Sequence, residues 1–135
     1  MKGLTPIRRR RRRAWGLAVL ALLLPGCGAS DVAPIAPEEL ARRIAEGSAP
    51  LVLDVRSRDE FAAGHVRGAV NVPHSELPHR LDELDVAADT EVVVYCQSGR
   101  RAGIASEALA EAGFERVMHL EGHWARWSES DLPSE

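Results

Sequence analysis

Residues 91–101 read Glu-Val-Val-Val-Tyr-Cys-Gln-Ser-Gly-Arg-Arg, an apolar run followed directly by a polar loop. The segment Glu91–Tyr95 contains three consecutive valines. A continuous apolar run of this kind is typical of a central parallel strand that is buried on both faces. Ala102 to Ala112 has apolar residues at helical spacing, and Gly113 is a typical residue for ending a helix. The predicted stripe consists of Ile104, Ala105, Ala108, Leu109 and Ala112. The run therefore predicts a strand, a loop and a helix in immediate succession.

The segments on both sides extend this alternation of strands and helices. Further strands are expected at Leu51–Val55, Ala69–Val72 and Arg116–Leu120. Helices are expected at Pro37–Gly47, Arg58–Ala63 and Ser75–Leu84, the last interrupted early by Pro78, with a final helical turn at Trp124–Trp127. Alternating elements of this kind form a parallel sheet covered by helices on both faces. A chain of 135 residues has room for one such α/β domain and is too short for two.

Cys96 follows the central strand, at the edge of the sheet where α/β proteins bind their ligands. The loop after it contains Gly99, which permits backbone angles that other residues resist, and leads to the amino end of a helix. Arg100 and Arg101 add two positive charges, and no acidic residue occurs from Cys96 to Ser106. We therefore predict a catalytic thiolate at Cys96, in a loop that binds an anionic substrate through Gln97, Ser98, Gly99, Arg100 and Arg101.

The pattern Cys96-x-x-Gly99-x-Arg101 resembles the active-site loop of rhodanese-like domains. The resemblance extends from about Ala36 to Trp127 and is closest to the small exported single-domain thiosulfate sulfurtransferases. It implies a single rhodanese-like domain with a five-stranded parallel sheet and helices on both faces. Its upstream signature matches Asp54-Val-Arg56, Glu60-Phe61, Gly64-His65-Val66, Gly68-Ala69 and Asn71-Val-Pro73.

The resemblance also implies an activity. Cys96 would take sulfane sulfur as a persulfide, from thiosulfate or a persulfide donor, and pass it to cyanide or a thiol. Asp54 and Arg56 lie at a strand end, where we expect them to support the site by forming a structural ion pair or by anchoring the loop. One departure from the family pattern concerns the turn after the last strand, where Gly122-His123 replaces the frequent Gly-Gly. We expect either backbone strain at His123 or a different turn.

Two other functions stay open. Cysteine phosphatases with a related fold have a loop one residue longer, which would place arginine where Ala102 stands, so phosphatase or arsenate reductase chemistry is the weaker alternative. The second alternative is a non-catalytic rhodanese-like module that binds or senses sulfur on Cys96 without turnover. Cys and His residues do not have the spacing of zinc ligands, so no metal and no cofactor are expected.

The first residues have the order of a secretory signal. Basic residues from Lys2 to Arg13 precede the apolar core Ala14–Leu24, which as a helix would span about 16 Å and is too short for a stable transmembrane anchor. Leu24-Pro-Gly-Cys27 resembles a bacterial lipobox, although Pro25 replaces the usual small residue. We expect residues 1–26 to be a lipoprotein-type signal, Cys27 to carry lipid, residues 27–34 to be a tether and residues 35–130 to be the domain.

We expect export to place the domain at the periplasmic face of the cell envelope, where lipid anchors it. The alternative is a plain cleaved signal, which would give a soluble periplasmic protein. From Cys27 onward the chain has 10 Arg, no Lys and 20 acidic residues, a balance that repels nucleic acid. The expected partners are the membrane, through lipid on Cys27, a small anionic sulfur donor and a thiophilic acceptor. The domain is expected to be a monomer.

Overall fold

The computed structural model describes residues 32–135, so the predicted signal, Cys27 and most of the tether lie outside the described residues. Five strands form one sheet in the order β1-β5-β4-β2-β3, and every neighbouring pair is parallel. This confirms the predicted five-stranded parallel sheet. The strands are β1 (Ala33–Ile35), β2 (Leu51–Asp54), β3 (Val70–Asn71), β4 (Val92–Tyr95) and β5 (Val117–Leu120).

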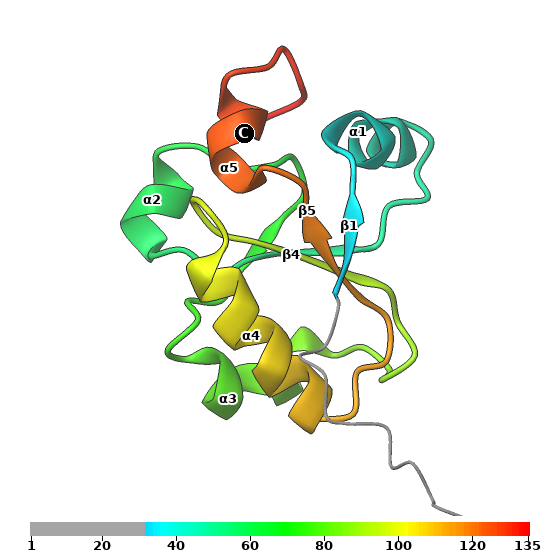
Figure 1. The fold of residues 1–135 in the computed structure, drawn as a ribbon, viewed down its shortest axis with the longest axis vertical. Coiled ribbons are helices and arrows are strands. Elements are labelled where there is room, and N and C mark those ends of the chain that lie inside the picture. Colours follow the sequence, from blue (N-terminus) through cyan, green and yellow to red (C-terminus); the bar gives the residue numbers. More distant parts are fainter. Residues whose placement is uncertain (1–31) are drawn as a thin grey trace, which may run out of the picture.

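Helices cover both faces of the sheet, as predicted (Figure 1). On one face, α3 and α4 pack with a 3₁₀ turn (η1) over a cluster that includes Leu53, Val94 and Leu109. On the other, α1 and α5 pack over a cluster that includes Leu40, Val93 and Trp127. The helices are α1 (Pro37–Ala45), α2 (Arg58–Ala62), α3 (Leu77–Arg80), η1 (Leu81–Leu84), α4 (Arg100–Glu111) and α5 (His123–Ser128).

The central strand β4 contributes side chains to both clusters. Val92 and Val94 lie on the α4 face, whereas Val93 and Tyr95 lie on the opposite face, because successive side chains of a strand point to opposite sides. All four residues are fully buried. Cys96, the next residue, continues the alternation and therefore lies on the α4 face.

The edge strand β1 is the element that the sequence pattern missed. Ala33 and Pro34, assigned to the tether, pair with Met118 and His119 of β5. The strand is three residues long and contains proline, which has no N–H to donate and is confined to sheet edges. The tether prediction is therefore wrong at these two residues.

Two predicted helices differ in detail. The expected helix Ser75–Leu84 divides into α3 and η1, and Asp85 ends η1 with a left-handed φ of 47°. Helix α4 begins at Arg100, two residues before the predicted start. Its buried side is formed by Ala102, Ala105, Ser106 and Leu109, whereas Ile104 is 47% exposed. The predicted stripe was wrong at Ile104 and at Ala112, which is also exposed. Ile104 differs in direction from its neighbour Ala105 by about 100°, and Ala112 lies just past the last helical residue.

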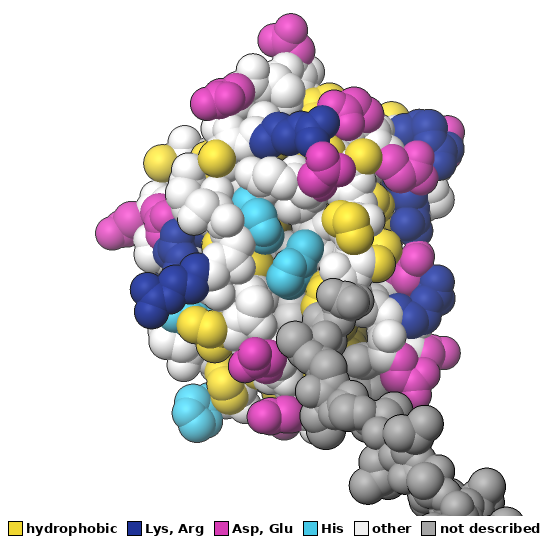
Figure 2. All heavy atoms as spheres, viewed as in Figure 1, with side chains coloured by type: hydrophobic (Ala, Val, Ile, Leu, Met, Phe, Trp, Pro, Cys, Tyr) yellow, Lys and Arg dark blue, Asp and Glu magenta, His cyan; other side chains and the backbone are white. Residues whose placement is uncertain are grey.

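The packed domain continues past residue 130, the predicted end. Val66 and Ser134 form an antiparallel bridge, and the backbones of His65 and Glu135 exchange hydrogen bonds of 2.9 and 3.0 Å. The indole Nε1 of Trp127 donates to Ser134 Oγ at 3.2 Å. Acidic and arginine side chains alternate over the surface in Figure 2. Across residues 32–135, no helix has the length and apolar character needed to cross a membrane.

Candidate active site

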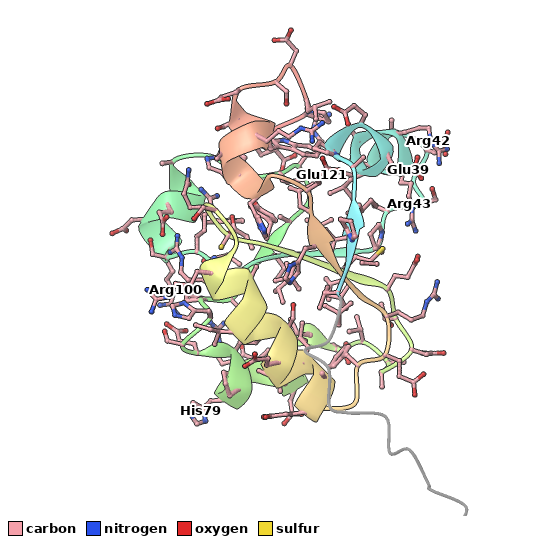
Figure 3. The ribbon with its side chains drawn as sticks, viewed as in Figure 1. Glu39, Arg42, Arg43, His79, Arg100 and Glu121 are labelled. Carbon is pink, nitrogen blue, oxygen red and sulfur yellow. The ribbon has the colours of Figure 1, made fainter. Side chains whose placement is uncertain are left out.

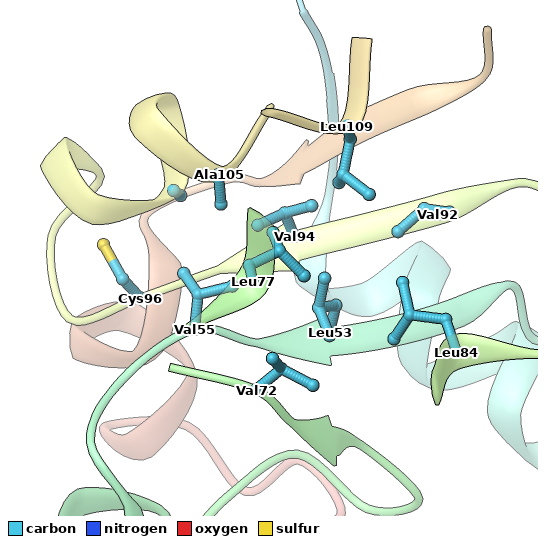
Figure 4. Packing of buried hydrophobic residues seen from close by; sticks show 11 residues of the cluster. Leu53, Val55, Val72, Leu77, Leu84, Val92, Val94, Cys96, Ala105 and Leu109 are labelled. Atoms are coloured by element: carbon cyan, nitrogen blue, oxygen red, sulfur yellow. The ribbon is translucent and has the colours of Figure 1, made fainter. Parts of the chain in front are cut away.

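Cys96 lies where β4 ends and the loop to α4 begins, on the same side as Val94 and Ala105 (Figure 4). The residue is 1% exposed. The Gly99 N–H donates to Cys96 Sγ at 3.0 Å, and Gly99, at a left-handed φ of 119°, is the N-cap of α4. The sulfur therefore lies at the positive end of a 12-residue helix that has no acidic residue in its first turn. We call residues 96–99 the Cys96 loop.

Helix α5 orients this loop from the other side. The first-turn N–H groups of Trp124 and Ala125 donate to the carbonyl oxygens of Cys96 and Gln97 at 3.0 and 3.2 Å. A trans peptide directs its C=O and its N–H in opposite directions. The next N–H groups, those of Gln97 and Ser98, therefore point away from α5. Successive N–H groups turned to one side of a loop form an anion-binding cradle.

Arg101 is held by an acidic residue that the sequence analysis quoted only as part of the family signature. Its two Nη atoms donate to the carboxylate of Glu60 at 2.7 and 2.8 Å. The ion pair with Arg101 lowers the pKa of Glu60 to about 2. The pKa of Arg101 is raised chiefly by Glu60 and further by Cys96. Arg101 thus joins the start of α4 to α2.

Three further residues of the predicted anion-binding segment face solvent. Gln97, Ser98 and Arg100 are exposed, and Figure 3 shows Arg100 at the edge of the molecule. Arg100 forms no ion pair with any residue of the described chain, 32–135. This arginine is available to an anion that approaches from solution.

The predicted ion pair between Asp54 and Arg56 is present and buried. Arg56 Nη2 lies 2.6 Å from Asp54 Oδ2, and the side chains are 2% and 0% exposed. Arg56 Nη2 also donates to the carbonyl of Gly64 at 2.7 Å, and the guanidinium lies 4.6 Å from the ring centre of Trp124. Asn71 Nδ2 donates to the carbonyls of Asp54 and Arg56, both at 3.0 Å. The pair therefore ties β2 to α5 beneath the site and does not touch Cys96 Sγ.

Two histidines lie behind the Cys96 loop. His123 Nδ1 is 3.4 Å from the amide nitrogen of Cys96, and the His119 and His123 ring centres are 5.6 Å apart. His119 Nε2 lies 2.7 Å from Ser106 Oγ on α4. Burial lowers the pKa of both histidines, and the charge of His119 lowers that of His123 further. His123 has a φ of 52°, which confirms the strained backbone expected at this turn.

The structure brings Cys96 and Gly99 into contact and places Arg101 in the first turn of the helix that follows, whereas the hydrogen bonds of Asp54 and Arg56 within residues 32–135 do not reach Cys96 Sγ. Sequence reasoning missed the pairing of Glu60 with Arg101. One signal was present: Ser57-Arg-Asp-Glu60 has the Ser-x-x-Glu spacing of a capping box, and both of its hydrogen bonds form. Within residues 32–135, no group of three or more His, Cys, Asp or Glu side chains is placed to hold a metal ion.

Known proteins share this sequence and fold. A sulfurtransferase from Allochromatium vinosum is 34% identical over 96 residues, which cover 71% of this chain and 88% of that protein. Thiosulfate sulfurtransferase 16, chloroplastic, from Arabidopsis thaliana is 35% identical over 92 residues, covering 61% and 77%. The crystal structure of the Alr3790 protein from Anabaena sp. matches with a TM-score of 0.68 at 29% identity, covering 75% of this chain and 90% of that one.

Several other curated relatives are longer, so that the chain spans 54% to 63% of their length. The rhodanese-like domain itself matches residues 36–130, from the residue before α1 to the residues after α5. This chain therefore belongs to the rhodanese-like domain family, which includes the sulfurtransferases named above.

Proposed function

We propose that this protein is a sulfurtransferase that carries sulfane sulfur as a persulfide on Cys96. The donor is thiosulfate or a persulfide, and the acceptor is cyanide or a thiol. The observation that carries the proposal is the position of Cys96 Sγ, which accepts the Gly99 N–H at 3.0 Å at the amino end of α4. A helix amino end and backbone N–H groups favour the thiolate, which is the nucleophilic form of cysteine.

In the first half-reaction the Cys96 thiolate attacks the outer sulfur of thiosulfate. A Cys96–sulfur bond forms, the sulfur–sulfur bond of thiosulfate breaks, and sulfite leaves with the electron pair. The attack needs no general base because the thiolate has no proton to lose. The N–H groups that face away from α5 and the exposed Arg100 are suited to receive the donor anion.

In the second half-reaction an acceptor thiolate or cyanide attacks the terminal sulfur of the Cys96 persulfide. The bond between the two sulfurs breaks, and Cys96 leaves as the thiolate while the acceptor becomes a persulfide or thiocyanate. The loop after Cys96 is short, because α4 starts four residues after it at Arg100. A short loop suits a terminal sulfur better than a phosphoryl group, which supports sulfur transfer over phosphatase chemistry.

Intact-protein mass spectrometry after exposure to thiosulfate tests the proposal. We expect an adduct of one sulfur atom on wild-type protein and on Cys27→Ser, and its loss on addition of cyanide with release of thiocyanate. Cys96→Ser should show neither the adduct nor turnover. Adduct formation without transfer to any acceptor would favour the sensing module, and thiosulfate-dependent activity of Cys96→Ser would exclude the mechanism.

A further inference from the structure

We infer that His123 is a positioning residue that braces the Cys96 loop, and that only its neutral imidazole can do so. The inference rests on the proposed function for its kinetic consequences, although the brace itself is a property of the folded loop. His123 stands where the sequence departs from the Gly-Gly of its family.

The ring of His123 contacts both ends of the Cys96 loop. At one end, Nδ1 lies 3.4 Å from the amide nitrogen of Cys96 and accepts its N–H. At the other end, a Cβ added to Gly99 would lie 2.9 Å from His123 Nε2, so the ring fills the space beside Gly99. One imidazole thus spans the loop from its first residue to its last. The next residue, Trp124, adds the N–H that binds the Cys96 carbonyl.

The backbone of His123 is held in an unfavourable conformation. Its φ of 52° lies in the left-handed region, and among residues 32–135 Asp85 is the one other non-glycine residue with positive φ. Such strain persists only where the surroundings determine it, and it gathers at functional sites. A glycine at position 123 would remove the strain and the brace together, so the conformation alone does not explain the histidine.

The contact with Cys96 requires an unprotonated Nδ1, which places the single proton of the neutral ring on Nε2. Protonation would set an N–H of the ring against the N–H of Cys96. One titratable side chain, His119 on β5, lies against His123, which also contacts the backbone amide of Cys96 after β4. The charged residues nearest to His123 in sequence, Glu121 and Arg126, form an ion pair with each other. From α4, the Ser106 hydroxyl contacts His119, the histidine that lies beside His123.

The direction of the pH effect follows from these surroundings. Burial and His119 lower the pKa of His123 below the ordinary value of 6.5. A histidine with a lowered pKa supports the fold in its neutral form, so the brace is intact above pH 6.5 and is lost as the pH falls through the lowered value. Sulfur transfer should therefore decline on the acid side for a reason separate from the thiol.

The test combines NMR on the wild-type protein with three variants. Nitrogen-15 spectra of the histidine rings should show His123 with its proton on Nε2, and the Cys96 amide should shift with the titration of His123. His123→Gly should lower the single-turnover rate of persulfide formation about two- to tenfold with the donor affinity unchanged, and should lose the part of the acid decline that depends on His123. His123→Asn, which tolerates positive φ and keeps an acceptor, should recover the rate without the decline. His79→Asn, on the exposed end of α3, is the control.

Two results would overturn the inference: a proton on Nδ1 in the neutral ring, or a His123→Gly variant with the rate and pH profile of the wild type. The outcome is separable from the proposed function. If the wild-type protein transfers no sulfur, the proposed function fails, whereas the ring tautomer and the coupled shift of the Cys96 amide still decide whether His123 braces the loop.

Discussion

Arg100 and Arg101 follow one another in the chain but have different surroundings. The Arg101 side chain is 28% exposed and forms an ion pair with Glu60, and its pKa is raised chiefly by Glu60 and further by Cys96. Arg100 is exposed and has no ion-pair partner in the described part of the chain. The sequence analysis assigned both residues to substrate binding. In the structure Arg101 is paired with Glu60, whereas Arg100 is exposed, so we propose different roles for them: Arg101 orders the start of α4, and Arg100 meets incoming anions.

This difference predicts unequal kinetic effects. Arg101→Ala removes a half-buried charged contact and should lower kcat/KM for thiosulfate on the order of ten- to a hundredfold. Arg100→Ala removes an exposed charge and should cost less than about fivefold, an effect that disappears at high salt. Steady-state kinetics at low and high ionic strength measures both variants. A larger effect of Arg100→Ala than of Arg101→Ala would reverse the assignment.

Position 99 requires glycine for two reasons: its φ is positive, and the His123 ring leaves no room for a side chain. Gly99→Ala forces a side chain into a φ of 119° and brings Cβ to 2.9 Å from His123 Nε2. We expect a loss of about 1–3 kcal/mol in the free energy of unfolding, measured with urea. The matched control is Gly103→Ala within α4, where nothing lies within 4 Å of the added Cβ. That variant should gain up to about 1 kcal/mol, because alanine is the better helix former. Equal stability of the two variants would contradict the account.

At the level of elements, the short helix α2 holds Arg101 in place. Helix α2 has only five residues, and its capping box joins the Ser57 hydroxyl to the Glu60 N–H at 3.2 Å and the Ser57 N–H to the Glu60 carboxylate at 3.0 Å. The same carboxylate binds Arg101 at the start of α4. Glu60 therefore joins two helix amino ends, and the position of Arg101 depends on the folding of α2.

This link predicts an acid-sensitive contribution to stability. The pKa of Glu60 is lowered to about 2 from 4.5, so the pair stabilises the fold above pH 4.5 and is lost as the pH falls toward 2. Because the Glu60 side chain is 35% exposed, Glu60→Gln should lose only about 1 kcal/mol at pH 7 after allowance for solvent screening.

Urea unfolding at several pH values between 2 and 7 measures this contribution. The difference between the wild type and Glu60→Gln should vanish near the low end of that range. Glu107→Gln, at an exposed position of α4, should match the wild type throughout. A difference that stays constant with pH would show that the carboxylate acts through packing rather than charge.

At the scale of the whole molecule, the residues of the candidate site lie at the carboxyl-terminal end of the sheet. The ends of β2 and β4 provide Asp54 and Cys96, and the amino ends of α2, α4 and α5 meet around them. The amino end of α4, with no acidic residue in its first turn, and the exposed Arg100 add positive potential here, whereas from Cys27 onward the chain has 10 arginines and 20 acidic residues. That contrast favours a small anionic donor over a large acidic partner.

We propose that the domain is exported and anchored through lipid on Cys27, which lies outside the described residues. The domain is acidic and provides no attraction to anionic lipid, so stable anchoring requires more than one acyl chain. Cys27→Ser should release the protein to the soluble fraction or stall its processing. Cell fractionation and mass spectrometry of the amino-terminal peptide provide the measurement. Wild-type protein that is soluble in the periplasm with an unmodified Cys27 would refute the anchor and leave the sulfurtransferase proposal intact.

The sequence by itself determined the fold class and the position of Cys96 at the end of the central strand. Periodicity identified β2, β4 and β5, and the abrupt change from valines to a polar loop located Cys96 at a strand end. These features can be predicted from short stretches of sequence, because a continuous apolar run indicates a strand buried on both faces and a glycine or proline indicates the end of a helix. Membership of the family followed from the same motifs.

Only the tertiary structure decided which side chains meet. Glu60 and Arg101 are 41 residues apart, and Cys96 and His123 are 27 apart. Pairing across such distances depends on how helices pack on a finished sheet, and an acidic or histidine residue on a surface helix has many possible neighbours before folding. The three-residue edge strand β1 likewise exists only because β5 is there to pair with it. The contacts of His123 with the Cys96 loop and of Glu60 with Arg101 therefore became visible only in the folded structure.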